Sequence, residues 1–298
     1  MGRSGEAFFD DLDSKFRNLA EENDELRREL RRVLALKGER KPPTWKRRKA
    51  RRGHFRRYLV IPDTQVKPGV PMEHLAWAGR YIADKRPDVI VHLGDHWDMP
   101  SCSSWDKGKR AFEGRRYKAD IEAGNEGMRL LVEPFRRKRS YNPEMHFLLG
   151  NHEQRIERAL DVEPWLEGLI GYENFDLDGW EVHDFLKPVE LDGTLFCHYF
   201  ASPLSGRPIG GTAHNLLRKV GKSCVMGHRQ VLDVAVQELP DGTQRRALIA
   251  GSFYQHFEKY KSHQGNGHFR GLVVLNEMAN GMWDQMEVSL DYLRRKYG

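Results

Sequence analysis

Short apolar runs and helical periodicities alternate along the chain from residue 58 onward. Apolar runs bounded by polar or turn residues predict strands, here at 58–62, 88–95, 145–151, 194–198, 223–228, 246–252 and 272–277. Apolar residues recurring every three to four positions predict helices, here over 72–86, 117–138 and 152–160. Strands alternate with helices in the first half, and strands dominate the second. This order favours an α/β layered sandwich over a barrel.

Two segments of this region lack a clear period. Residues 161–188 contain several Gly, Pro and aromatic residues, and we expect an inserted loop or a cap over a site. Residues 253–270 are basic, aromatic and glycine-bearing. They are either a loop near the site that touches a nucleic-acid backbone or a plain surface loop.

The N-terminal stretch 10–37 has a different pattern, in which apolar residues follow one another at alternating spacings of four and three. Such a heptad repeat predicts a coiled coil, with Leu12, Phe16, Leu19, Asn23, Leu26, Leu30 and Val33 on its seam. A lone Asn on the seam favours a parallel homodimer, because its amide loses its hydrogen bonds in other registers. The alternative is a single amphipathic helix that lies on the main domain. We therefore expect a coiled-coil helix over 1–37, a basic linker over 38–57 and a catalytic domain over 58–298.

The net charge of +6 is concentrated in the linker. Between Lys37 and Arg57 eleven Lys or Arg residues face one acidic residue, a local charge of +10. Such density is typical of a nucleic-acid-binding arm, because each cation near a phosphate releases a condensed counterion. The alternative is a solvated linker whose charges only maintain solubility. We expect DNA as a partner, bound by Lys46, Arg47, Arg48, Lys49, Arg51 and Arg52.

Composition also indicates the cellular setting. The sequence has no run of about 18 apolar residues, so we expect no transmembrane helix. The N-terminus is too acidic for a signal peptide. The three cysteines, Cys102, Cys197 and Cys224, are far apart and form no CxxC pair, which favours a reducing compartment. We expect a cytoplasmic protein of a bacterium or of a phage-infected host cell.

Polar residues of metal-ligand type follow five of the predicted strands. Because strand ends in α/β proteins converge on one rim, we expect these side chains to meet. Glycines precede three of them and permit tight turns there. The residues are Asp63 and Gln65, Asp95 and Asp98, Asn151 and His152, His198, and His228 and Gln230.

The order D-x-[H or Q], GDxxD, GNHE, H, GHx[H or Q] resembles the signature of the calcineurin-like metallophosphoesterase superfamily. The resemblance covers residues 58 to the C-terminus. It implies an αββα double β-sheet sandwich and two divalent metal ions that activate a water for attack on phosphorus.

The resemblance also implies a role for each residue. Asp95 would bridge both ions, and one ion would be completed by Asn151, His198 and His228. Asp63 would bind the other ion. His152 would assist the leaving group, with Asp98 orienting its ring.

The sequence departs from the family pattern at one ion, where Gln65 and Gln230 stand in place of two histidines. A glutamine ligates only through its neutral amide oxygen, and oxygen-rich sites suit Mn²⁺ or Mg²⁺ over Zn²⁺. We therefore expect two divalent ions, Mn²⁺ being preferred with Mg²⁺ or Zn²⁺ as alternatives, and a weaker second site filled mainly by Mn²⁺ or Mg²⁺. The alternative is that this site is inactive and that the protein works with one ion or not at all.

Other residues near the motifs have separate interpretations. Met99 stands where protein phosphatases of the superfamily have a phosphate-binding arginine, so GDHWDMP looks more like the nuclease and phosphodiesterase branches. His96 and Trp97 are expected to add a polar contact and a stacking surface beside the metals, although Trp97 could equally belong to the core. Glu153 is expected to accept hydrogen bonds near the loop. His92 is expected to pack inside the protein. Arg155 and Arg158 are expected to lie on a solvated helix face.

These expectations give one main function and two alternatives. The main one is a phosphodiesterase or nuclease that hydrolyses DNA through a two-metal centre. An enzymatic alternative is a phosphomonoesterase or small-molecule phosphodiesterase. A non-enzymatic alternative is a DNA-binding or scaffolding protein on a degenerate phosphoesterase fold.

Overall fold

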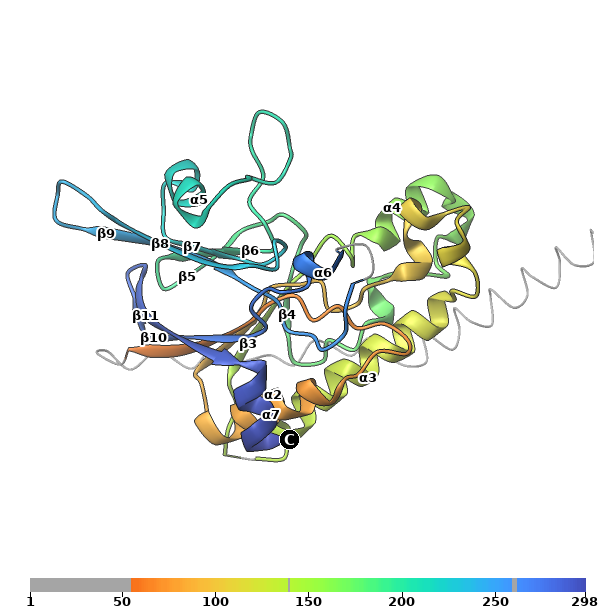
Figure 1. The fold of residues 1–298 in the computed structure, drawn as a ribbon, viewed down its shortest axis with the longest axis horizontal. Coiled ribbons are helices and arrows are strands. Elements are labelled where there is room, and N and C mark those ends of the chain that lie inside the picture. The colour runs from red at the N-terminus through yellow and green to blue at the C-terminus, as the bar shows by residue number, and fades with distance from the viewer. Residues whose placement is uncertain (1–54, 139, 259–261) are drawn as a thin grey trace, which may run out of the picture. The chain divides into compact units, whose positions relative to one another are not determined.

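Two β-sheets face each other in the part of the chain that the structure, a computed structural model, describes: residues 55–138, 140–258 and 262–298 (Figure 1). The first sheet has the strand order β11-β10-β1-β2-β3-β4. Its strands β1 to β4 run parallel, whereas β10 pairs antiparallel with β1 and with β11. The strands are β1 (Arg56–Ile61), β2 (Val89–His92), β3 (Glu144–Leu148), β4 (Glu181–His183), β10 (Gly271–Ala279) and β11 (Met282–Ser289).

The second sheet has the strand order β5-β6-β7-β9-β8. Strands β6, β7 and β9 run parallel, and β5 and β8 pair antiparallel at its two edges. The strands are β5 (Val189–Leu191), β6 (Thr194–Cys197), β7 (Cys224–Met226), β8 (Leu232–Glu238) and β9 (Gln244–Ala250).

Helices cover the outer faces of both sheets, so the layers follow the order α, β, β, α. Helices α2 (Glu73–Lys85), α3 (Tyr117–Arg136) and α7 (Leu290–Tyr297) pack through one apolar cluster on the first sheet. Helix α5 (Ala213–Val220) packs through another on the second sheet. A third cluster, with Tyr58 and Val91 from one sheet and Phe196 and Leu248 from the other, fills the layer between the sheets.

Two further helices belong to the described chain. Helix α4 (Arg155–Val162) directly follows the GNHE segment, and helix α6 (Ser262–Gly265) lies within the segment 253–270. Short 3₁₀ turns complete the described chain. They are η1 (Pro100–Cys102), η2 (Ser104–Asp106), η3 (Arg110–Phe112), η4 (Pro164–Leu166) and η5 (Tyr172–Asn174).

The predicted layered α/β sandwich is therefore confirmed for the described residues. Each predicted strand and helix has a counterpart, with ends that differ by a few residues. The sequence pattern did not predict β4, β5, β8, β11, α5 or α7. The segment 161–188, expected as a loop or cap, contains η4, η5 and the edge strand β4. It also packs on the core, because Phe175 stacks on Trp97 with the ring centroids 4.2 Å apart.

The predicted boundary between linker and catalytic domain is shifted. Strand β1 begins at Arg56, two residues before the expected start. Arg56 pairs with Glu144 and with Asp192, so it serves the sheet rather than the basic linker. The predicted coiled coil and the cationic residues 46–52 lie outside the described residues.

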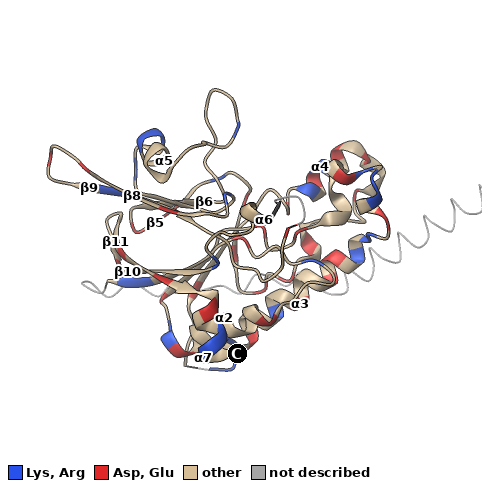
Figure 2. Ribbon diagram, in the orientation of Figure 1, with Lys and Arg blue, Asp and Glu red and all other residues tan. Residues whose placement is uncertain are grey.

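Charges of both signs are interspersed on the helices (Figure 2). On α3, Arg129 pairs with Glu126 and Glu133. The described part of the chain thus shows no concentration of positive charge along α3 comparable to that of the linker sequence. Among the described residues, no helix is both long and apolar enough to cross a membrane.

Candidate metal centre

The predicted site residues are brought together by the parallel strands of both sheets. Loops that follow β1, β2 and β3 leave the first sheet at the same edge, and loops that follow β6 and β7 leave the second sheet in the same way. A backbone bridge joins Asp63 to Ser252, and the Phe253 amide donates to the Asp63 carbonyl at 2.8 Å. The two sheets are thereby tied together at the rim where the site lies.

Asp95, His198 and His228 form one cluster, with potential ligand atoms all within 4.8 Å of one another. The Asn151 side-chain oxygen lies 2.9 Å from His198 Nε2 and 2.7 Å from His228 Nδ1. The structure thus brings together the four residues predicted to hold one ion.

His198 is oriented by its other ring nitrogen. Nδ1 lies 2.7 Å from the Leu93 carbonyl oxygen, and because a carbonyl only accepts, Nδ1 carries the proton. In the neutral ring Nε2 then has the free lone pair and points at the cluster. A metal-binding histidine is commonly fixed in this way.

Charge within the cluster follows from burial and proximity. Burial opposes a charge on His198, but Asp95 outweighs it and raises the pKa of His198 to about 9. Burial also opposes the Asp95 carboxylate, yet His152 and His198 hold its pKa well below the usual range. Burial and the neighbouring His198 lower the pKa of His228 to about 4, which favours the neutral imidazole that a metal needs.

Asp63 and Gln65, predicted for the other ion, carry buried polar atoms that fit a missing cation. The second carboxylate oxygen of Asp63 and both polar side-chain atoms of Gln65 have no hydrogen-bond partner among the described residues. Burial and the nearby Asp95 raise the pKa of Asp63 to about 6. Buried groups of this kind are costly without a partner. A divalent ion held by Asp63 and Gln65 would satisfy the carboxylate oxygen and the amide oxygen, but not the Gln65 NH₂ group, which needs an acceptor.

Gln230 has a protein partner instead. Its side-chain oxygen accepts a hydrogen bond from the Tyr254 hydroxyl at 2.9 Å. An amide oxygen has two lone pairs, so one remains for an ion. The role of Gln230 as a ligand stays a prediction.

Several of these residues have strained backbones. Gln65, Asp95, His228 and Gln230 all have positive φ, between 42° and 65°. Such conformations are uncommon outside glycine and cluster at functional sites, where the surrounding structure holds them. The strain therefore marks the same rim as the polar residues.

Two of the glycines that precede site residues act differently from the prediction. Gly94 has φ +90°, as a tight turn requires, but Gly150 and Gly227 are not in the positive-φ region. A Cβ at Gly150 would collide with an Asp95 carboxylate oxygen, and one at Gly227 would lie 2.5 Å from an Asp63 oxygen. These two glycines make room for the carboxylates rather than for a turn.

Glu153 holds the Asp95 loop in place, as predicted. Its buried carboxylate accepts four backbone N–H groups, those of Asp95, His96, Trp97 and Gly150, at 2.7–2.9 Å. Burial and Asp95 nevertheless raise the pKa of Glu153 to about 7. The carboxylate thus fixes both the GDxxD and the GNHE turns.

His152 and Asp98 form the predicted pair. His152 Nδ1 lies 2.5 Å from an Asp98 oxygen, and its Nε2 lies 3.7 Å from Asp95 Oδ2. Burial opposes a charge on His152, but Asp95 and Asp98 outweigh it and raise its pKa. Lys67 pairs with the other Asp98 oxygen at 2.8 Å and with Glu258 at 2.6 Å.

Arg155 belongs to this site, although the sequence suggested a solvated helix face. Its guanidinium contacts the Asp98 backbone carbonyl and carboxylate and lies 3.2 Å from His152 Nε2. The i, i+3 spacing from His152 on a helical turn was the available signal. Arg158 donates to the Asn151 backbone carbonyl, so it too faces the GNHE turn.

His96 and Trp97 are both fully buried in the core, which is the alternative that the sequence left open for Trp97. Trp97 is fully buried and donates from its indole nitrogen to Asn125. His96 accepts from Thr64 or donates to it at 2.7 Å, and its other nitrogen donates to the Gly124 carbonyl. His92 is also packed inside, as predicted, and Met99 is fully buried.

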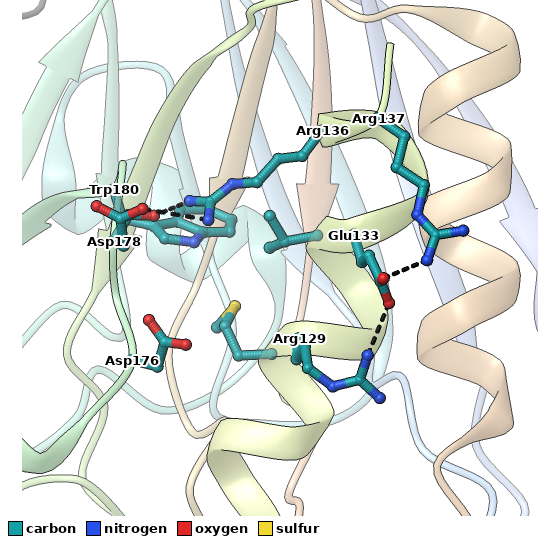
Figure 3. A pocket seen from close by; sticks show the side chains of 9 residues that line it. Arg129, Glu133, Arg136, Arg137, Asp176, Asp178 and Trp180 are labelled. Carbon is teal, nitrogen blue, oxygen red and sulfur yellow. Dashed lines mark hydrogen bonds and ion pairs between the residues drawn. The ribbon is translucent and has the colours of Figure 1, made fainter.

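A separate pocket of about 370 Å³ lies between α3 and residues 176–180 (Figure 3). Its arginines are engaged: Arg136 binds Asp178, and Arg129 and Arg137 bind Glu133. None of the predicted site residues lines it. The pocket is therefore distinct from the candidate centre.

Comparisons with known proteins identify two phage relatives. The chain is 29% identical over 202 residues to the Gene 54 protein of Mycobacterium phage L5, an alignment that covers 65% of this chain and 76% of that protein. It is 29% identical over 184 residues to the Gene 54 protein of Mycobacterium phage D29, covering 58% and 68%. No family model matches. Vps29 of Chaetomium thermophilum aligns at 10% identity with a TM-score of 0.34, over 78% of this chain and 96% of that one, a likeness too low to support a conclusion.

Proposed function

We propose that this chain is a metal-dependent phosphoesterase that cleaves phosphodiester bonds, with DNA as its substrate. The observation that carries the proposal is the convergence of buried Asp63, Asp95 and His198 with half-buried Asn151 and His228, beside the His152–Asp98 pair. Divalent ions at this centre would neutralise phosphate oxygens and lower the pKa of a water molecule.

The chain's own residues supply the proton to the leaving oxygen. Against the effect of burial, Asp95 and Asp98 raise the pKa of His152, which favours its protonated form, and Asp98 fixes the ring through Nδ1. Nε2 accepts from Arg155 in this structure; once Arg155 turns to a phosphate oxygen, Nε2 is free to take up the proton that the departing oxygen needs.

Arg155 compensates for the arginine that Met99 replaces. Its guanidinium is at the entrance to the His152 pair, with its side chain 18% exposed, and a planar fork binds phosphate oxygens in a bidentate manner. It can turn from His152 Nε2 to a phosphate oxygen when substrate enters. Phosphate binding is thus assigned to α4 rather than to the loop at Met99.

The assignment to DNA rests on the linker sequence. The cations at 46–52 would hold a polyanion through phosphate contacts. A small-molecule phosphodiester would not need them, and neither would a phosphomonoester.

The test compares three substrates with Mn²⁺, Mg²⁺ and Zn²⁺ in parallel: p-nitrophenyl phosphate, bis-p-nitrophenyl phosphate and defined single- and double-stranded DNA. The proposal predicts cleavage of DNA and of the diester, with kcat/KM for the monoester at least tenfold lower. Preference for the monoester would establish the alternative enzyme.

Two variants separate catalysis from binding. His152→Gln is expected to lower kcat by about 10²–10⁴ without loss of DNA affinity. Asn151→Ala is expected to abolish hydrolysis. DNA binding without hydrolysis by the unaltered chain with any of the three ions would instead favour the non-enzymatic alternative.

A further inference from the structure

A second cluster of metal-ligand side chains lies on strands β3 and β4, away from the residues of the candidate centre. His146, Glu181 and His183 place potential ligand atoms within 4.8 Å of one another. His146 pairs in register with Glu181, and Leu148 with His183, in the parallel β3–β4 ladder. Because side chains alternate along a strand, Glu181 and His183 point to the same face of the sheet.

The distances suit a tetrahedral ion. His146 Nδ1 lies 3.0 Å from His183 Nε2 and 3.7 Å from a Glu181 oxygen. Ligands at about 2.0–2.1 Å from a tetrahedral zinc ion are about 3.3–3.4 Å apart. The observed separations lie on either side of this value, so small side-chain rotations would bring the three atoms onto one ion.

The protonation pattern favours a ligand at His146. Its Nε2 lies 2.9 Å from a Glu144 oxygen, and because a carboxylate accepts, Nε2 carries the proton. The lone pair is then on Nδ1, which points at His183 and Glu181. A carboxylate that fixes the tautomer of a histidine in this way is a common feature of zinc sites.

Charge and access also fit a cation. Glu144 is held by Arg56, which Asp192 also contacts, so acidic groups outnumber basic ones around the cluster. His146 is buried, whereas the Glu181 side chain is 68% exposed on the edge strand, and this opening gives an ion a way in.

We propose that His146, His183 and Glu181 bind a zinc ion that fastens the edge strand β4 to β3. Two imidazoles and one carboxylate prefer zinc to Mg²⁺ or Ca²⁺, and a water would complete the coordination. The strand β4 has only three residues and is paired on one side, so the ion would add a stabilising cross-link at the end of the sheet. The His146–His183 hydrogen bond is the arrangement without the ion. On binding, His183 Nε2 releases its proton and Nδ1 takes one up through solvent, so the ring stays neutral.

The test is zinc binding by the full chain, stripped with a chelator, in an Asp63→Asn/Asp95→Asn/Asn151→Ala background that removes a ligand of each expected ion and the residue that would bridge both. We expect one zinc ion per chain by metal analysis after dialysis. His183→Gln in the same background should lose it, and Glu144→Gln should weaken it about 10- to 100-fold. His214→Gln, an exposed histidine on α5, is the matched control and should retain it.

A second readout guards against variants that fold poorly. Zinc at about a hundredfold above its Kd should raise the Tm of the background protein by about 5–10 °C. Glu181→Gln, a change at an exposed position, should keep the unliganded Tm within about 2 °C and lose most of the zinc-dependent rise. Equal zinc content and equal Tm shifts in the unaltered cluster and in His183→Gln would overturn the proposal, leaving a hydrogen-bonded histidine pair.

Discussion

At the scale of single residues, the candidate centre depends on buried groups that are costly to leave unsatisfied. Glu153 satisfies four backbone N–H groups at once. Among the described residues, one Asp63 oxygen and the Gln65 amide oxygen instead lack a hydrogen-bond partner, which fits ligands of a cation. The GNHE and GDxxD motifs therefore have two functions. Asp95 and Asn151 are proposed to bind the ions, and Glu153 holds the loop that carries Asp95.

Glu153→Gln is the residue-scale test of this division. The amide offers one acceptor oxygen and brings N–H groups against backbone donors, so at least one donor loses its partner. We expect a loss of about 2–4 kcal/mol in the free energy of unfolding, measured by urea denaturation. Glu157→Gln, four residues further along in α4 and partly exposed, should change stability by less than about 0.5 kcal/mol. Equal effects of the two changes would show that Glu153 does not support the loop.

Among single residues, the sequence predicted best those whose side-chain chemistry and position after an apolar strand both indicated a metal ligand. Polar residues that directly follow apolar strands predicted the centre, and the structure brings Asp95, Asn151, His198 and His228 into contact distance. Arg155 was misassigned because the rotation of α4, which depends on tertiary packing, decides whether a helical arginine points outward. His146 and His183 were not foreseen, because β4 is too short to show a strand pattern.

At the scale of elements, the long apolar strands and amphipathic helices were predictable, and the short edge elements were not. Strand β8 has exposed positions on much of its length, and β11 alternates irregularly. Their pairing with β9 and β10 comes from neighbours distant in sequence. Helix α2 is the opposite case, because its apolar periodicity predicted the helix over 72–86. Its buried face includes His74.

His74 makes the docking of α2 sensitive to acid. Burial lowers its pKa to about 3, although Gln255 offers a hydrogen bond at 3.2 Å. The unfolded chain takes up a proton near the ordinary value of about 6.5, but the folded chain does not until about pH 3. The unfolded state thus binds more protons in this window, and stability falls as the pH drops through it.

Replacing His74 should reduce this dependence. His74→Gln is expected to remove about 3 kcal/mol of the stability difference between pH 7 and pH 4, measured by urea denaturation at both values. His214→Gln, at an exposed site, should leave the difference unchanged. An unaltered pH dependence in His74→Gln would show that this histidine is not buried in its neutral form.

At the scale of the whole molecule, a cationic segment precedes, in the sequence, the domain that we propose to be hydrolytic. The layered fold follows from the alternation of strands and helices, and the described residues confirm it. The coiled coil and the DNA arm remain predictions from the heptad pattern and the charge run. Strand β1 begins at Arg56.

Deletion of residues 1–54 therefore separates the two parts without cutting β1. We expect DNA affinity to fall steeply and the slope of log K against log salt to flatten by up to about 5, as six phosphate contacts are lost. Turnover of bis-p-nitrophenyl phosphate should persist within about twofold. Binding by fluorescence anisotropy across a salt series measures this, and an unchanged affinity would show that the segment is not the DNA arm.

The central claim is that the buried cluster holds divalent ions and that hydrolysis depends on them. The most direct measurement is calorimetric Mn²⁺ titration of the chelator-treated His183→Gln chain, with diester hydrolysis assayed in the same samples. We predict one tight and one weaker Mn²⁺ site, the weaker at Asp63 and Gln65, and activity that rises with occupancy. Asn151→Ala should lose the tight site and the activity together. Hydrolysis that continues at its full rate without metal, or no Mn²⁺ binding at all, would contradict the account.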